Sequence, residues 1–162
     1  MRSPRVRIRV GLRARRALLT CHIVAGGGLL GSVAVVLAIN IRAAATTDAE
    51  LARSSYELLA MLTLAFGIPL SFTSLISGVL LGLATPWGVL RYAWVLSKLA
   101  LVIGVILVGA LVLGPGTDAM RHGNGGAETR LIVGAAYDVV ALTLATVLSV
   151  FKPRRSPERG TS

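Results

Sequence analysis

The part of the sequence that decides the fold is the stretch TPWGVLRYAWVLSKL at residues 85–99. It is a short turn with aromatic and basic side chains that leads directly into an apolar helix. Residues 94–113 are apolar apart from Ser97 and Lys98. A helix of about 20 apolar residues is long enough to cross a hydrocarbon core of about 30 Å. Because tryptophan and tyrosine prefer the headgroup boundary, this stretch marks one face of a membrane.

The composition of the whole chain supports a membrane protein. Of its 162 residues, 54% are hydrophobic and 15% are charged, which is too apolar for an ordinary soluble domain. The net charge of +10 would also suit nucleic-acid binding. The basic residues lie next to long apolar runs, however, so we expect a lipid bilayer as the partner and no nucleic acid. The single cysteine, Cys21, excludes an intrachain disulfide.

Four apolar segments are each long enough to span the bilayer, and they predict an all-α fold. The predicted spans are residues 17–41, 56–83, 94–113 and 131–151. We therefore expect a four-helix transmembrane bundle over residues 17–151, with a basic segment at 1–16 and a basic tail at 152–162.

Two of the connections are expected to be loops. Residues 42–55 carry acidic side chains, and residues 114–130 are rich in glycine without helical periodicity. Within the second span, Pro69 is expected to kink the helix because proline donates no backbone hydrogen bond. A hydroxyl at Ser71 or Thr73 is available to satisfy the backbone there.

The basic residues predict the orientation of the bundle. Thirteen lysines and arginines lie at the two termini and in residues 85–99, whereas four lie at the other two connections. Positive charge concentrates on the cytoplasmic side of membrane proteins, and anionic lipids attract basic segments. We expect both termini in the cytoplasm, a multi-pass protein of the inner (cytoplasmic) cell membrane, and anionic lipids at the basic termini.

Small residues predict where the helices pack. A stripe of small or hydroxyl-bearing residues follows one face of the second span: Thr63, Gly67, Ser71, Ser74, Gly78 and Gly82. The stripe suggests a packing seam first and the lining of a pathway second. In the first span, Gly27 and Gly31 form a pair at the four-residue spacing that lets two membrane helices approach closely.

Three ionisable residues within the spans are candidate functional residues: Asp138, Lys98 and His22. A lone carboxylate at Asp138 costs free energy, so we expect it to be protonated or hydrogen-bonded. It suits either an interhelical hydrogen bond or a proton or cation site. Lys98 can reach the nearby membrane surface, and it differs from Asp138 in depth by roughly two helical turns. We therefore expect no direct ion pair between them.

His22 is expected to be packed or hydrogen-bonded, and a haem or copper ligand is the alternative. A six-coordinate haem needs two axial ligands at similar depth. Met61 begins the second span near the opposite face, and His122 lies in an expected loop. We therefore expect no cofactor, unless two chains each contribute His22. The chain contains no phosphate loop, nucleophile elbow or metalloprotease motif, so we expect no enzyme.

Three stretches carry a resemblance to a known family: residues 85–99, LLTCHIVAGGGLLG at 18–31 and TVLSVFKPR at 146–154. They resemble a bacterial family of small four-helix integral membrane proteins that is catalogued as a domain of unknown function. The resemblance implies an integral membrane protein with no assigned activity. The first helix also looks like those of copper-resistance and b-type cytochrome membrane domains, although the further intramembrane histidines of those proteins are missing here.

These observations leave two main functional classes. One is a non-enzymatic membrane protein that packs with itself or with a membrane partner through its glycine and serine seams. The other is a small transporter or a proton- or ion-linked protein that uses Asp138, with Lys98 and His22 as auxiliaries. A haem- or copper-related protein that uses His22 is the third alternative.

Overall fold

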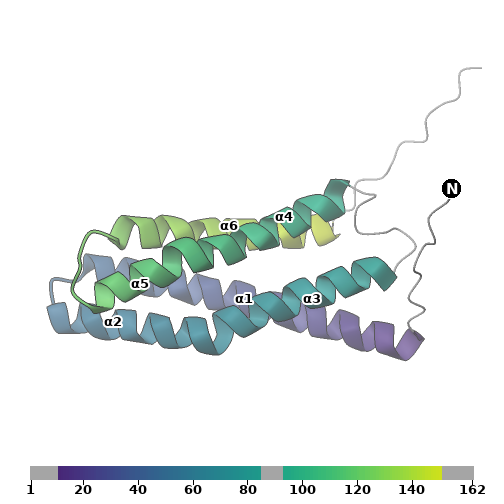
Figure 1. Cartoon of the computed structure of the whole chain (residues 1–162), viewed down its shortest axis with the longest axis horizontal. Coiled ribbons are helices and arrows are strands. Elements are labelled where there is room, and N and C mark those ends of the chain that lie inside the picture. Colours follow the sequence, from purple (N-terminus) through teal and green to yellow (C-terminus); the bar gives the residue numbers. More distant parts are fainter. Residues whose placement is uncertain (1–10, 85–92, 151–162) are drawn as a thin grey trace, which may run out of the picture.

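The computed structural model describes residues 11–84 and 93–150, which form a bundle of long helices (Figure 1). The turn predicted within residues 85–92, most of the basic segment at 1–16 and the tail at 152–162 lie outside the described residues.

The described residues form an all-α structure. The first helix is α1 (Leu12–Ala45), and the last is α6 (Glu128–Val150). The second segment consists of α2 (Ala49–Leu62), a π-helical turn η1 (Thr63–Gly67) and α3 (Ile68–Ala84). The third segment consists of α4 (Ala93–Val108), a π-helical turn η2 (Gly109–Leu113) and α5 (Gly114–Arg121). Four helices are long and apolar enough to cross a membrane: Leu12–Ala45, Ala49–Leu83, Val95–Arg121 and Glu128–Val150. The prediction of four spans is confirmed in this sense.

Helix α1 is the centre of the arrangement. It packs against α2 and α3 on one side and against α6 on another, and α6 in turn packs against α4. Successive spans run in opposite directions, so the start of α1 and the end of α6 lie at the same end of the bundle (Figure 1). We call this the terminal end. The turn end is the opposite one, where residues 46–48 and 122–127 reverse the chain and α5 packs against α2.

The turn at residues 46–48 is much shorter than the loop predicted at 42–55, so that prediction was wrong. Helix α1 continues to Ala45, and α2 begins at Ala49. The Asp48 side chain caps α2 by accepting hydrogen bonds from the backbone N–H of Glu50, at 3.0 Å, and of Leu51, at 3.2 Å. This cap satisfies donors that a helix start leaves unpaired, so α2 begins well before its apolar residues.

The loop predicted at 114–130 is also mostly helical. Residues Gly114–Arg121 form α5, which extends the third span. Only residues 122–127 form the turn, and Gly123 and Gly126 there have positive φ angles of 79° and 94°, which glycine adopts without strain. The glycines and the proline suggested a loop, but Pro115 lies at the start of α5, where a helix tolerates proline.

Both prolines within the apolar spans follow a π-helical turn. Pro69 comes two residues after η1, and Pro115 comes two residues after η2. In each turn the backbone pairs across five residues: Ile68 N–H donates to Thr63 O, and Gly114 N–H donates to Gly109 O. The wider turn makes room for the proline ring, and the second span changes direction there (Figure 1).

Two apolar clusters fill the interior of the bundle. The turn-side cluster consists of Val36 and Ala43 from α1, Tyr56 and Leu59 from α2, Leu113 from η2, and Ala127, Leu131 and Ala135. The middle cluster consists of Leu29 and Val33 from α1, Val105 from α4, and Ala141 and Leu142 from α6. Both clusters join α1 to α6, so the interface between these two helices is the core of the fold.

Candidate functional site

Asp138 lies between the two apolar clusters, close to the middle of α6. Ala135, three residues before it, belongs to the turn-side cluster, and Ala141, three residues after it, belongs to the middle cluster. The side chain is only 2% exposed. Because α6 begins at Glu128, the carboxyl lies about 15 Å from the helix start. This is deeper than the roughly 10 Å expected from the shorter predicted span.

The Asp138 carboxyl has an oxygen without a hydrogen-bond partner. In the part of the chain that the structure describes, two buried side-chain polar atoms are unpaired, Asp138 Oδ1 and Asn40 Oδ1. Buried polar groups in proteins are nearly always paired. A buried carboxyl oxygen without a partner is therefore an exception, and it makes Asp138 a candidate functional residue.

The packing around Asp138 is close because its neighbours on α6 are small. Gly134, Ala135 and Ala141 share its buried face. A Cβ atom at Gly134 would lie 3.1 Å from Leu113 Cδ2 and 3.3 Å from Val108 Cγ1. These small residues let the third span come close to α6, one turn from the carboxyl.

Charged side chains on the neighbouring helices contact other groups or lie on the surface, away from Asp138. Lys98 Nζ on α4 donates to Ser149 Oγ at 3.2 Å, and Ser149 is three turns along α6 from Asp138, about 16 Å by helix rise. Asp118 and Arg121 of α5 pair with each other, at 3.6 Å. Arg42 of α1 is exposed. The structure thus keeps Lys98 and Asp138 apart.

His22 joins α1 to α3 near the terminal end. Its Nδ1 lies 3.1 Å from Ser74 O and 3.0 Å from Ser77 Oγ. A carbonyl oxygen can only accept, so Nδ1 carries the proton and donates. The Ser77 hydroxyl in turn donates to Thr73 O at 2.6 Å. The half-buried imidazole therefore belongs to a serine-lined contact between two helices, separate from Asp138.

The predicted stripe on the second span lies partly along this contact. Ser71 and Ser74 are buried, and a Cβ atom at Gly78 would lie 3.0 Å from His22 Cε1. Gly67 and Thr63 lie in η1, where a Cβ at Gly67 would meet only Thr63. Gly82, in the last turn of α3, is half-buried. Ser77 is not part of the predicted stripe, although its spacing of three residues from Ser74 places it on the same face.

Gly27 and Gly31 make no close approach within the chain, so their role in helix packing stays a prediction. Both are exposed, and nothing lies within 4 Å of a Cβ atom at either position. The neighbouring glycines Gly26 and Gly28 face α3 instead: a Cβ there would meet Ser74 and Leu70, respectively. A shallow groove of about 220 Å³ borders the outward face and is lined by Gly28, Gly31, Ser32, Val35, Leu62 and Phe66.

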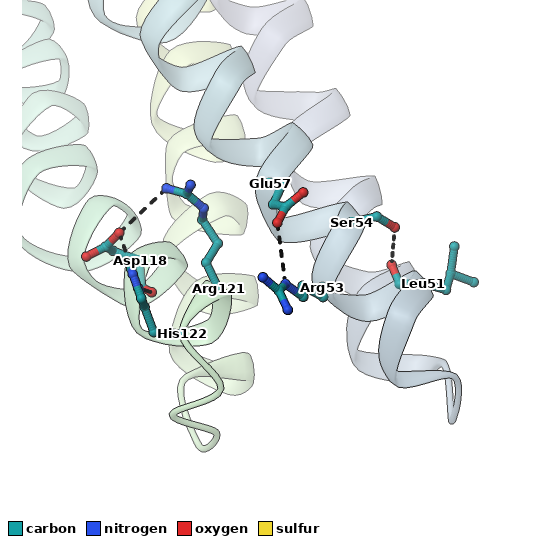
Figure 2. Close-up of polar contacts among 7 residues, drawn as sticks. All are labelled: Leu51, Arg53, Ser54, Glu57, Asp118, Arg121 and His122. Carbon is teal, nitrogen blue, oxygen red and sulfur yellow. Dashed lines mark hydrogen bonds and ion pairs between the residues drawn. The ribbon is translucent and has the colours of Figure 1, made fainter.

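The polar residues of the turn end pair with one another on the surface. Figure 2 shows Arg53 paired with Glu57 on α2, at 3.4 Å, and Asp118 paired with Arg121 and His122 at the end of α5. Exposed pairs of this kind contribute little stability. Among the described residues, no three histidine, cysteine, aspartate or glutamate side chains lie together as metal ligands would.

Asn40 is a buried polar residue that was not among the predicted site residues. It is an amide in an otherwise apolar part of α1, and it is only 2% exposed. Its Nδ2 donates to Val36 O of its own helix, at 2.9 Å. The spacing of four residues from Val36 could have placed it on the buried face, but the residues that it faces could not be predicted.

Comparison with known proteins adds no assignment. No protein-family model, curated protein or solved structure matches the chain. The resemblance of residues 18–31, 85–99 and 146–154 to a family therefore stays a prediction.

The contrast between Gly78 and Gly31 leads to a prediction about packing. We expect Gly78→Leu to destabilise the monomer by about 1–3 kcal/mol, because the new side chain displaces His22 from its position against α3. Gly31→Leu is the matched control, since a side chain at that position meets open space. Thermal unfolding in detergent, at a concentration where the chain is monomeric, measures both. Equal losses in the two variants would contradict the placement of α1 against α3.

Proposed function

We propose that the chain is a proton-linked integral membrane protein in which Asp138 is the proton-binding group. The observation that carries the proposal is the burial of this carboxyl inside a membrane-spanning helix with Oδ1 unpaired. Ionisable residues within membrane spans generally mark ion pathways or proton relays. In its protonated form the carboxyl is neutral, and it becomes a charge only when the proton leaves.

The alternative role, an interhelical hydrogen bond, has less support. The Asp138 side chain makes no hydrogen bond to another described residue, whereas His22 bridges two helices through such bonds. An unpaired buried polar group costs about 1–3 kcal/mol. If Asp138 had only a structural role, an apolar side chain at this position would make the fold more stable. The carboxyl therefore suits a role in which it gains and releases a proton.

The proposed orientation places the terminal end in the cytoplasm. Among the described residues at that end, Arg13, Arg15 and Arg16 begin α1 and Lys98 begins the third span. In the full sequence, 13 of the 17 lysines and arginines lie in the two terminal segments and residues 85–99, whereas four lie at the turn end: Arg42, Arg53, Arg121 and Arg130. Because positive residues concentrate on the cytoplasmic side, this distribution supports cytoplasmic termini in the cell membrane, with anionic lipids near the arginines.

Reporter fusions test the orientation. A reporter at Gly125, in the turn between α5 and α6, should be active on the outer side, and a reporter at the carboxyl terminus should be active in the cytoplasm. The reverse pattern would overturn the proposed orientation.

Infrared spectroscopy of the protein in lipid vesicles tests the proposed role of Asp138. As the pH is stepped, the C=O band of a protonated carboxyl should grow and shrink in the wild type and be missing in Asp138→Asn. Asp118→Asn is the control, since it removes an exposed carboxyl at the turn end and should leave the Asp138 band intact. A carboxyl band that Asp138→Asn does not change would reject the proposal.

A second candidate function is assembly with another copy or with a membrane partner through the outward face of α1. The observation that favours it is the open space at Gly27 and Gly31, since exposed glycines let a second helix approach closely. Gly31→Leu should then convert an oligomer into a monomer while leaving the fold of the single chain intact. Sedimentation in detergent measures this change, and an unaltered mass would remove the assembly proposal.

A further inference from the structure

Besides Asp138 on α6, Asn40 on α1 is a buried residue with an unpaired side-chain oxygen. It lies between Val36 and Ala43, which both belong to the turn-side cluster together with Ala135 of α6. The Asn40 amide uses Nδ2 to donate to Val36 O, but its Oδ1 has no partner. Asn40 thus presents an unused acceptor in the interior, as Asp138 does.

The two residues lie at different heights. By helix rise, Asn40 lies about 8 Å from the end of α1 at Ala45, and Asp138 lies about 15 Å from the start of α6 at Glu128. Both of these helix ends lie at the turn end (Figure 1), so the two residues differ in height by roughly 8 Å. This separation is too long for a direct hydrogen bond. A chain of a few water molecules between polar groups can span it.

The buried polar side chains of the described residues, apart from Asp138, form two groups: Asn40, Ser55 and Thr117 toward the turn end, and Ser71, Ser74 and Ser77 on α3. By helix rise, Ser55 on α2 and Thr117 on α5 lie at about the same height as Asn40, and these two helices pack against each other. Toward the terminal end, the interface between α1 and α6 is closed by the apolar middle cluster. The buried serines of α3 lie where that helix packs on α1, and Ser77 bonds His22 there.

We infer that Asn40 is a positioning residue that holds water between Asp138 and the turn end, so that Asp138 exchanges its proton with that side. This inference rests on the proposed function of Asp138. In this route the amide oxygen of Asn40 accepts a hydrogen bond from water, and the carboxyl of Asp138 is the group that gains and loses the proton. The titratable groups near the route are Tyr56 in the turn-side cluster and Arg42, Asp118, Arg121 and Glu128 at the turn end.

Hydrogen–deuterium exchange of the Asp138 carboxyl tests the route. The wild-type protein in lipid vesicles is transferred to D₂O, and the shift of the carboxyl C=O band is followed with time. We expect Asn40→Leu to slow the exchange about tenfold or more, because water must then enter an apolar passage. Asn40→Ser should retain most of the wild-type rate, because a hydroxyl can still bind water. Thr117→Val should also slow the exchange and provides an independent variant on the same side.

Ser77→Ala is the matched control, since it removes a buried hydroxyl toward the terminal end. It should leave the rate unchanged, and a slower rate in this variant alone would move the route to the other end and overturn the inference. An unchanged rate in both Asn40→Leu and Thr117→Val would also overturn it, while the proposed function would stand. A wild-type carboxyl band that never responds to pH would reject the proposed function, and the inference with it.

Discussion

Every backbone N–H and C=O within a bilayer must find its partner inside the protein, and the rest of this structure depends on that constraint. The four spans meet it as helices. The two prolines within the spans each remove a donor, and in both cases the chain responds with a π-helical turn that ends just before the proline. At Ile68 and Gly114 the backbone pairs across five residues. The spans therefore continue past proline as helix, and the third extends to Arg121 at the turn end.

The same constraint acts on polar side chains, which here mostly bond to the backbone of their own helix. Ser71 donates to Ile68 O, Thr143 to Val139 O and Ser149 to Ala145 O. These local bonds satisfy a hydroxyl without another helix, so serine and threonine carry no functional implication by themselves. A carboxyl has no hydrogen to donate when it is ionised, and an amide has two groups to satisfy. At Asp138 and Asn40, hydrogen bonds within the same helix do not satisfy every polar atom of the side chain, and Oδ1 of each residue has no partner.

The sequence was sufficient to predict the number and type of the spans, because about 20 apolar residues in a row have few other solutions. The sequence did not predict where the spans begin and end. The Asp48 cap lets α2 begin in a polar segment, and α5, with Pro115 at its start, forms in a glycine-rich segment. Composition alone predicts loops in both segments. The small residues around Asp138 indicated a buried face, and its depth indicated that it lies apart from Lys98. The lack of a partner for Asp138 Oδ1 depends on how the four helices pack. Likewise, Gly31 and Gly78 are indistinguishable by spacing, and only packing separates the open position from the closed one.

Along the interface between α1 and α6, the polarity differs between the two sides of Asp138. From Asp138 toward the turn end, α1, α2 and α5 each bury one polar side chain in the part of the chain that the structure describes: Asn40, Ser55 and Thr117. Toward the terminal end, the α1–α6 interface contains the aliphatic side chains of the middle cluster. A charge or a water molecule meets a lower barrier where polar groups can replace its hydration. In the route that we propose, Asp138 therefore exchanges its proton with the turn end, where polar groups are available, and not across the aliphatic side of the interface.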